Sequence, residues 1–327
     1  MNKKIQALAE RAIETPDCKL SNADTSLLLS AHGTDVFDMI FFAGKIREKY
    51  KGNTVFSCSI INAKSGHCSE DCAYCAQSGH HNTGVQVYPM LDQKQILETA
   101  QRLEGAGATH FSMVMSGFTP GGEDLDKVCS ATQKILQKTN LRVCASLGVL
   151  TDKMAQKLKE AGISNYHHNL ETAQSHFDKI CTTHKYSDDV QTVRAAKKAG
   201  FVVCSGGIMG LGESWDQRLE LALTLKDLDV DTIPLNFLNP IPGTKMADMP
   251  RLAPMDALKS IALFRFVHPD KNITICGGRE VTLGDFQSWI FAAGSNALMS
   301  GDYLTTKGRN IKEDMEMIDN LGFEIKA

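Results

Sequence analysis

The strongest constraint on the fold is a regular alternation of short apolar runs with helix-like segments. The runs are rich in apolar and β-branched residues, as buried parallel strands are. There are eight of them, at residues 54–61, 110–116, 141–148, 165–170, 201–207, 231–238, 273–278 and 297–301. Alternating strands and helices predict a parallel sheet with right-handed crossovers.

The segments between these runs have the period of amphipathic helices. In residues 92–107 the apolar side chains share one face, Asp92 can cap the start, and glycines end the segment. Residues 151–162 and 187–200 repeat this scheme. Eight such units favour an α/β fold closed as a (βα)8 TIM-type barrel, with an open doubly wound sheet as the alternative.

The chain length of 327 residues suits one barrel, and no Pro/Ser/Gly-rich linker divides it. We expect an N-terminal helical extension over residues 1–50, the (βα)8 barrel over residues 51–305, and a C-terminal tail over residues 306–327. The tail and the barrel are expected to form a single domain.

Composition excludes several classes of protein. The net charge is −3 with acids and bases mixed, so no basic stripe predicts nucleic-acid binding. No apolar run approaches the roughly 18 residues of a membrane span, and the charged N-terminus has no secretory apolar stretch. We therefore expect a cytoplasmic protein, in which the ten cysteines are not disulfide-bonded.

Cys68, Cys72 and Cys75 lie together in the stretch GHCSEDCAYCAQ, directly after the first expected strand. In a barrel this stretch is a loop at the C-terminal face, where active sites are built. Structural zinc usually takes four ligands, often as two CxxC pairs. The spacing here is C-x3-C-x2-C, and a zinc site completed by one of the neighbouring histidines is the alternative.

Iron–sulfur clusters are held by cysteine thiolates. Three thiolates on a four-iron cluster leave one iron open, and we interpret the missing fourth cysteine as the functional feature. The amine and carboxylate of S-adenosylmethionine (SAM) can chelate that iron. An electron passed through the cluster would then cleave the sulfonium to a 5′-deoxyadenosyl radical.

With Tyr74 before its last cysteine, the loop resembles the signature of the radical SAM superfamily. Further stretches, NYHHNLET, CSGGIMGLGES, IPLNFLNPIPGT and GGRE, resemble the biotin synthase family over residues 40 to 305. The resemblance implies insertion of sulfur between two unactivated carbons of dethiobiotin. It also implies two adenosyl radicals used in sequence and a second iron–sulfur cluster that donates the sulfur.

The resemblance implies that Cys68, Cys72 and Cys75 hold a [4Fe–4S] cluster and that Tyr74 lies near the adenine of SAM. Glu171 stands where the family commonly has Asp, which binds the ribose hydroxyls.

The run GIMGLGE matches the family's cofactor-binding glycine motif, which gives Gly207, Ile208 and Gly210 as SAM contacts. Asn169 and Asn236 match asparagines that hydrogen-bond the substrate. Carboxamides complement a cyclic urea, which offers two N–H donors and a carbonyl.

For the second cluster, the common family ligands are three cysteines and an arginine. Cys144, Cys204 and Arg279 match three of these, but the remaining cysteine position is Ser112. Serine is a poor ligand where soft thiolate is preferred. Cys276 in turn stands where the family usually has Ser, so a thiol lost on the second strand is balanced by one gained on the seventh. The alternative is that Ser112 and Cys276 are ordinary packing residues.

Our hypothesis is that Cys144, Cys204 and Cys276 hold the auxiliary cluster, a four-iron cube with an extra sulfide on its open iron. Arg279 then balances charge or donates hydrogen bonds beside it. A [2Fe–2S] cluster bound by Arg279 is the alternative. Strand alternation would put residues 276 and 279 on opposite faces, unless the two glycines between them form a bulge.

Other residues receive no role at this stage. Cys18, Cys129 and Cys181 are not assigned, and Cys58 is assigned to the core of the first strand. Of His167 and His168, at most one is expected to face the lumen, because neighbouring strand residues point to opposite faces.

Two further functions remain open from the sequence. One is another radical SAM enzyme of similar barrel, such as a hydrogenase maturase or a methylornithine synthase. The other is a non-catalytic iron–sulfur or zinc-binding protein. The absence of a flavin or nicotinamide motif predicts an external electron donor, a flavodoxin or ferredoxin. We also expect iron–sulfur assembly proteins as partners, and the family resemblance implies a homodimer.

Overall fold

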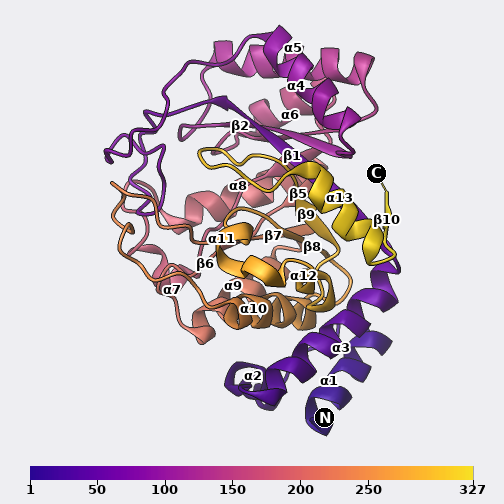
Figure 1. Cartoon of the computed structure of the whole chain (residues 1–327). Coiled ribbons are helices and arrows are strands. Elements are labelled where there is room, and N and C mark those ends of the chain that lie inside the picture. The colour runs from indigo at the N-terminus through magenta and orange to yellow at the C-terminus, as the bar shows by residue number, and fades with distance from the viewer. Residues whose placement is uncertain (327) are drawn as a thin grey trace.

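The computed structural model of the chain describes residues 1–326. Its parallel strands close into a barrel surrounded by helices (Figure 1), as the alternation of strands and helices predicts. Around the barrel the order is β1-β2-β3-β4-β5-β7-β8-β9, and pairing of β9 with β1 closes the ring. The open-sheet alternative is therefore wrong. The strands are β1 (Thr54–Lys64), β2 (His110–Met115), β3 (Arg142–Ser146), β4 (Asn165–His167), β5 (Val202–Cys204), β6 (Gly207–Met209), β7 (Thr232–Phe237), β8 (Asn272–Ile275) and β9 (Ala297–Met299).

The fifth position in the barrel is an interrupted strand. Both β5 and β6 pair with β7, and Ser205 and Gly206 separate them. A Cβ atom on Gly206 would lie 1.9 Å from the carbonyl oxygen of Pro234, so only glycine allows the backbones to approach here. The interruption brings the segment after β5 inward, beside the end of β4.

The barrel helices begin and end where local sequence signals place them. Asp92 caps α4 in a capping box with Gln95, and Thr151 caps α6. Gly162 ends α6 in the left-handed conformation at φ +100°. The helices from the barrel onward are α4 (Gln93–Gly105), α5 (Gly122–Lys138), α6 (Asp152–Ala161), α7 (Gln174–Phe177), α8 (Tyr186–Lys198), α9 (Trp215–Asp227), α10 (Pro254–Val267), α11 (Arg279–Leu283), α12 (Trp289–Ala292) and α13 (Ile311–Asn320).

Three helices precede the barrel and lie together on one side of it (Figure 1): α1 (Lys3–Glu14), α2 (Asn22–Ser30) and α3 (Thr34–Lys51). Helix α3 packs against α10 and leads directly into β1. At the other end of the chain, β10 (Glu324–Ile325) pairs with the first residues of β1. Both ends of the chain therefore meet the barrel at the end opposite the carboxyl ends of its strands.

The inner face of β1 is less buried than its outer face. Burial alternates along the strand, and the outward-facing Ser57 and Ser59 are 0% exposed beneath the surrounding structure. The intervening residues Phe56, Cys58 and Ile60 keep some exposure and line cavities. The lumen is thus hollow, in contrast to a barrel filled entirely by side chains.

The C-terminal segment is held to the barrel by a buried ion pair. The guanidinium of Arg279, at the start of α11, donates to Asp314 of α13 at 2.8 Å, and both side chains are 0% exposed. Arg309 also pairs with Asp314 at 3.3 Å. None of the helices within residues 1–326 combines the length and the apolar character needed to cross a membrane.

We predict that Asp314→Ala destabilises the fold, because it removes the buried carboxylate 2.8 Å from the Arg279 guanidinium and leaves only the longer ion pair with Glu280, at 3.4 Å. Removing one member of a buried pair costs about 3 kcal/mol. Urea unfolding followed by circular dichroism should show a clearly lower midpoint. Asp319→Ala, at an exposed position of the same helix, should leave the midpoint nearly unchanged, and equal midpoints for both variants would contradict the role of the pair.

Candidate active site

Two cavities lie end to end inside the barrel. The mouth cavity, of about 380 Å³, lies among the loops at the carboxyl ends of the strands. The inner cavity, of about 260 Å³, lies deeper, among the strands themselves. His167 and Met299 line both, so a group bound in one cavity lies next to a group bound in the other.

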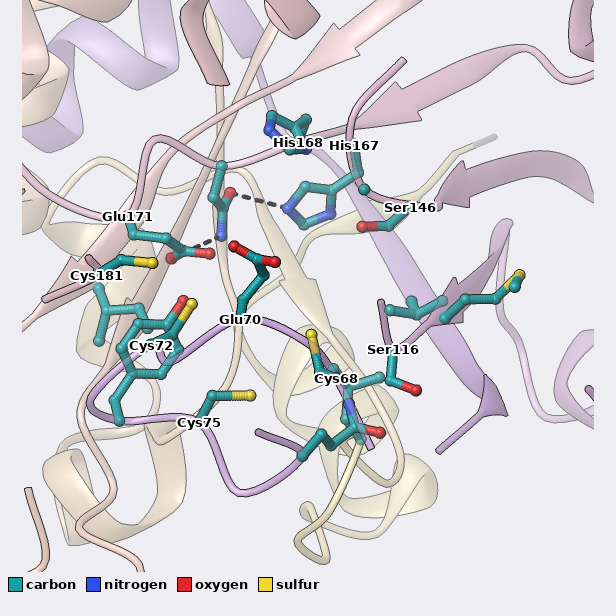
Figure 2. Close-up of a pocket in the computed structure, with 18 of the residues that line it drawn as sticks. Cys68, Glu70, Cys72, Cys75, Ser116, Ser146, His167, His168, Glu171 and Cys181 are labelled. Carbon is teal, nitrogen blue, oxygen red and sulfur yellow. Dashed lines mark hydrogen bonds between the residues drawn. The ribbon is translucent and has the colours of Figure 1, made fainter. Parts of the chain in front are cut away.

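The three-cysteine loop forms one wall of the mouth cavity. Cys68, Cys72 and Cys75 all line it, and Figure 2 shows the three side chains along one loop. Backbone hydrogen bonds fix the loop, including Cys75 N to Cys72 O at 2.9 Å and Gly79 N to Cys68 O at 2.8 Å. The loop therefore presents its thiols from a fixed backbone.

The local environment favours the protonated forms of Cys72 and Cys75 in the absence of a metal. A hydrogen bond with the Cys181 thiol, together with burial, raises the pKa of Cys72. Burial raises the pKa of Cys75 to about 11. Because metal binding by cysteine needs the thiolate, loading this site must release protons.

A buried network of charges attaches the loop to the barrel wall. His184 Nδ1 lies 2.6 Å from Glu70 Oε2, and its Nε2 lies 3.4 Å from Asp189 Oδ2. His168 also pairs with Asp189, at 2.8 Å. Burial lowers the pKa of His184, but hydrogen bonds with Asp189 and Cys181 outweigh it and raise the pKa to about 11. His184 is thus a cation between two carboxylates.

Glu70, Cys181 and His184 place potential ligand atoms within 4.8 Å of one another. The contacts of His184 with Glu70 and Cys181, at 2.6 and 3.3 Å, make this cluster a polar network that joins the three-cysteine loop to the segment 181–184. The sequence alone predicts no role for any of the three. The residues come from two segments more than a hundred positions apart, and only the fold brings them together.

Asn169 and Glu171 line the mouth cavity together with the three-cysteine loop. Asn169 Nδ2 donates to Glu171 Oε2 at 3.3 Å, and Asn169 Oδ1 lies 2.9 Å from His167 Nε2. Burial raises the pKa of Glu171 to about 7, although a hydrogen bond from Tyr74 acts in the opposite direction. Both residues line the mouth cavity, as does Tyr74.

The backbone of Glu171 is strained, with φ +62°. The glycine motif of β6 supports it: Ile208 N donates to Glu171 O at 2.8 Å, and a Cβ on Gly207 would lie 2.4 Å from that oxygen. Gly210 has φ +97°. Among the described residues of this motif, Ile208 is the one that lines the mouth cavity. The sequence predicts Gly207 as a contact of the cofactor. In the structure, Gly207 makes room for the backbone carbonyl of Glu171.

Asn236 of β7 lies on the same cavity, next to β8. Its Oδ1 accepts a hydrogen bond from Gly277 N at 2.9 Å, and its Nδ2 donates to Gly207 O at 3.4 Å. The carboxamides of Asn169 and Asn236 therefore reach one space, Asn236 from β7 and Asn169 from the segment that follows β4. His167 and His168 also both line it, so the expectation that at most one would do so is wrong. Strand β4 ends at His167, and alternation does not extend to His168.

The inner cavity gathers the deeper cysteines. Cys144, Cys204 and Cys276 all line it, as the hypothesis for an auxiliary cluster requires. Cys58 lines it too, so its assignment to the core is wrong. Both faces of β1 consist of apolar or small residues, so the sequence does not show which face points into the barrel. The two-residue period of a strand predicts that Cys58 and Ile60 point to the same side, and this was the signal in the sequence for the position of Cys58.

The charges around the inner cavity favour an anionic occupant. Arg142 and Lys51 line it, and among its described lining residues there is no carboxylate side chain. Burial raises the pKa of Cys58 to about 12 and that of Cys204 to about 11. Without a metal these thiols are neutral, and thiolates formed on metal binding would meet positive charge.

Two buried hydroxyl groups lack hydrogen-bond partners near the inner cavity. Thr274 Oγ1 lines the cavity, and Ser112 Oγ lies on the strand position paired with Cys144, so it points to the same side of the sheet. Buried hydroxyls without partners are rare in native structures. Sulfide or thiolate in the cavity would accept their hydrogen bonds, so the lining residues fit an iron–sulfur cluster.

Arg279 lies beside this cavity with its guanidinium turned toward Gln287 and Asp314, at 2.7 and 2.8 Å. Its charge still acts on Cys276: burial raises the pKa of that thiol, and Arg279 partly opposes the rise. Strand β8 ends at Ile275, and Arg279 begins a helix after Gly278 at φ +76°. Residues 276 and 279 both lie beyond the end of the strand, so strand alternation does not determine the directions of their side chains.

Comparison with known families agrees with this geometry. The family model of the radical SAM superfamily matches residues 64–225, and that of the biotin and thiamin synthesis associated domain matches residues 234–324. A biotin synthase of Syntrophus aciditrophicus is 51% identical over 98% of both chains. One of Geobacter metallireducens is 48% identical over 98% of this chain and 97% of its own. The chain belongs to the biotin synthase family.

Solved structures show the same fold at lower identity. Methylornithine synthase superposes with a TM-score of 0.85 at 22% identity, covering 98% of this chain and 97% of its own. The hydrogenase maturase HydG of Carboxydothermus hydrogenoformans superposes with a TM-score of 0.82 at 16% identity, covering 99% of this chain and 79% of its own. These likenesses support the barrel alone. The much higher identity to biotin synthases separates this chain from both enzymes.

We predict that Gly207→Ala perturbs the site, because its new Cβ would collide with the Glu171 carbonyl. Forcing an atom into a packed region costs about 1–3 kcal/mol, so the thermal unfolding midpoint should fall. Gly105→Ala, at the end of α4 where an added Cβ meets open space, is the matched control. If both variants unfold at the parent temperature, the close approach is not a constraint.

Proposed function

We propose that this member of the biotin synthase family converts dethiobiotin to biotin by radical insertion of sulfur. The observation that carries the proposal is the end-to-end arrangement of the two cavities. A three-cysteine loop and two carboxamides line one, further cysteines line the other, and His167 and Met299 join them. Relatives about half identical over nearly the whole chain are named biotin synthases.

In the mouth cavity, Cys68, Cys72 and Cys75 would hold a [4Fe–4S] cluster with one iron left for SAM. When bound, this cluster supplies the electron that cleaves SAM to a 5′-deoxyadenosyl radical. Tyr74 and Ile208 would contact the adenine, and the Glu171 carboxylate would accept hydrogen bonds from the ribose hydroxyls. Gly207 and Gly210 would act indirectly, by shaping the backbone that carries Ile208 and Glu171.

Asn169 and Asn236 would bind the ureido ring of dethiobiotin. Their side chains reach the mouth cavity from β7 and from the segment after β4, and each offers a donor and an acceptor. Asn236 is fixed by Gly277 and Gly207, and Asn169 by His167 and Glu171. Fixed carboxamides would hold the reacting carbons toward the inner cavity, where the sulfur is supplied.

In the inner cavity, Cys144, Cys204 and Cys276 would hold the auxiliary cluster, with Arg279 beside it. This cluster supplies sulfide, and a four-iron cube with an extra sulfide fits three cysteines better than a [2Fe–2S] cluster with an arginine ligand. The contacts of Arg279 with Asp314 and Gln287 support a role in charge balance. Arg142 and Lys51 line the cavity, and their positive charges would stabilise an anionic cluster there.

The electrons would come from a flavodoxin or ferredoxin, and iron–sulfur assembly proteins would load and rebuild both clusters. We further propose a cytoplasmic homodimer with the helical extension, barrel and tail acting as one domain. The cytoplasm suits the ten free cysteines.

The decisive experiment is anaerobic reconstitution with iron and sulfide, followed by SAM, dethiobiotin and a reductant. Mass spectrometry should detect both biotin and 5′-deoxyadenosine. Cys68→Ala should abolish both products, and Cys129→Ala, a partly exposed cysteine of α5, should keep them. Deoxyadenosine without biotin would indicate a different radical enzyme. Absence of both products from loaded parent protein would indicate a non-catalytic cluster protein.

We predict that SAM binding strengthens as the pH rises through about 7. The pKa of Glu171 is raised to about 7, so its carboxyl group is neutral below that pH and ionised above it. The ionised form accepts hydrogen bonds from the ribose hydroxyls more strongly than the neutral form, because its acceptor oxygens carry the charge. Between pH 8 and pH 6 the ionised fraction falls about tenfold, and affinity should fall by a similar factor.

Anaerobic equilibrium dialysis of SAM with cluster-loaded protein measures this dependence. Glu171→Gln should remove it, Glu171→Asp should retain a carboxylate response, and Glu98→Gln on the exposed face of α4 should behave as the parent. The same pH dependence in Glu171→Gln as in the parent would assign the titration to another group.

A further inference from the structure

We propose that Cys58 is the fourth protein ligand of the auxiliary cluster, on the iron that Cys144, Cys204 and Cys276 leave free. The inference rests on the proposed function, because it assumes an iron–sulfur cluster in the inner cavity. It gives the auxiliary cluster four thiolate ligands, in place of the three cysteines and one arginine of the common set.

The orientation of Cys58 follows from the strand that carries it. Ser57 and Ser59 on either side are 0% exposed and face outward, whereas Cys58 is partly exposed and lines the inner cavity. The residues paired with Cys58 are His110 on β2 and Met299 on β9. Both also line this cavity, so the three side chains point to the same space.

The four cysteines are evenly distributed around the barrel. In the closed order β1-β2-β3-β4-β5-β7-β8-β9 they stand on the first, third, fifth and seventh positions. Cys58 is on β1, Cys144 on β3 and Cys204 on β5, and Cys276 directly follows β8. In barrels of this type, side chains from alternate strands fill one layer of the lumen. Cys58 thus occupies the one quarter of the ring that the other three cysteines leave open.

The chemistry of the position also suits a ligand. Each iron of a four-iron cube takes one ligand from outside the cube, and thiolate is the usual one. Ser112, at the position where the family has its third cysteine, offers only a hydroxyl, which is a hard and poor ligand. Its unpartnered Oγ is suited instead to donate a hydrogen bond to cluster sulfur. The thiol missing from β2 is therefore replaced on the neighbouring strand β1.

The extra sulfide proposed above and Cys58 would compete for the same iron. While sulfide is bound, Cys58 remains a thiol. Once the sulfide has been lost, the sulfur of Cys58 would bind the vacant iron and release its proton to solvent, a ligand exchange that by itself changes no oxidation state. The four-iron core would then survive the loss of its sulfide.

The test uses full-length protein in which Cys68, Cys72 and Cys75 are all replaced by alanine, so that iron reports only the inner cavity. This parent is reconstituted anaerobically with iron and with sulfide limited to one per iron, then desalted and mildly oxidised. We expect about four irons per chain in the parent, one for each vertex of the cube. Adding Cys58→Ser should lower this to about three and give the electron paramagnetic resonance signal of a three-iron cluster.

Excess sulfide during reconstitution should restore the fourth iron in the Cys58→Ser protein, because sulfide takes the position of the missing thiolate. Cys58→Ala should give the same result, and Cys129→Ala should match the parent. Far-ultraviolet circular dichroism checks that each variant is folded. If Cys58→Ser retains four irons without added sulfide, the inference is overturned and the proposed function stands. If the parent itself binds no iron–sulfur cluster, the auxiliary cluster of the proposed function fails first.

Discussion

Closure of eight parallel strands is the constraint on which the rest of this structure depends. Once β9 pairs with β1, every second side chain of each strand must enter one narrow lumen. Cysteines that are far apart in the sequence, from Cys58 to Cys276, then line a single cavity. The same closure places the loops after the strands around one mouth, which is why the three-cysteine loop and both asparagines share a space.

The two cavities differ in charge, and each suits a different occupant. The mouth carries the carboxyl groups of Glu70, Glu171 and Asp189 together with the cation of His184. This setting suits a cofactor with a positive sulfonium and a ribose. The inner cavity has Arg142 and Lys51 and no carboxylate among its described lining residues. Complementary charges of this kind would keep a cationic cosubstrate at the mouth and an anionic cluster in the interior.

Rigidity at the mouth comes from contacts between segments distant in sequence. The strained backbone of Glu171 costs about 1–3 kcal/mol, and it persists because Ile208 donates to its carbonyl and Gly207 leaves room for it. On the opposite wall, His184 joins Glu70 of the cysteine loop to Asp189 of α8. A site held from both sides keeps its groups in place when a bound molecule is split into reactive fragments.

The sequence by itself determined the elements and the chemistry. Periodicity predicted all eight strand positions, Asp92 and Thr151 were readable as caps, and the spacing of Cys68, Cys72 and Cys75 indicated an incompletely ligated cluster. These are local signals, because each depends on residues only a few positions apart.

Only the tertiary structure decided which residues meet. The sequence placed Cys58 in the core, because the residues of an apolar strand do not show which of its faces borders a cavity. The network of Glu70, Cys181 and His184 was invisible because its members belong to separate segments. Arg279 matched a ligand position in sequence, yet its guanidinium is held by Asp314, a residue 35 positions away. Contacts of this range depend on how the closed barrel positions its helices and loops, which no local pattern encodes.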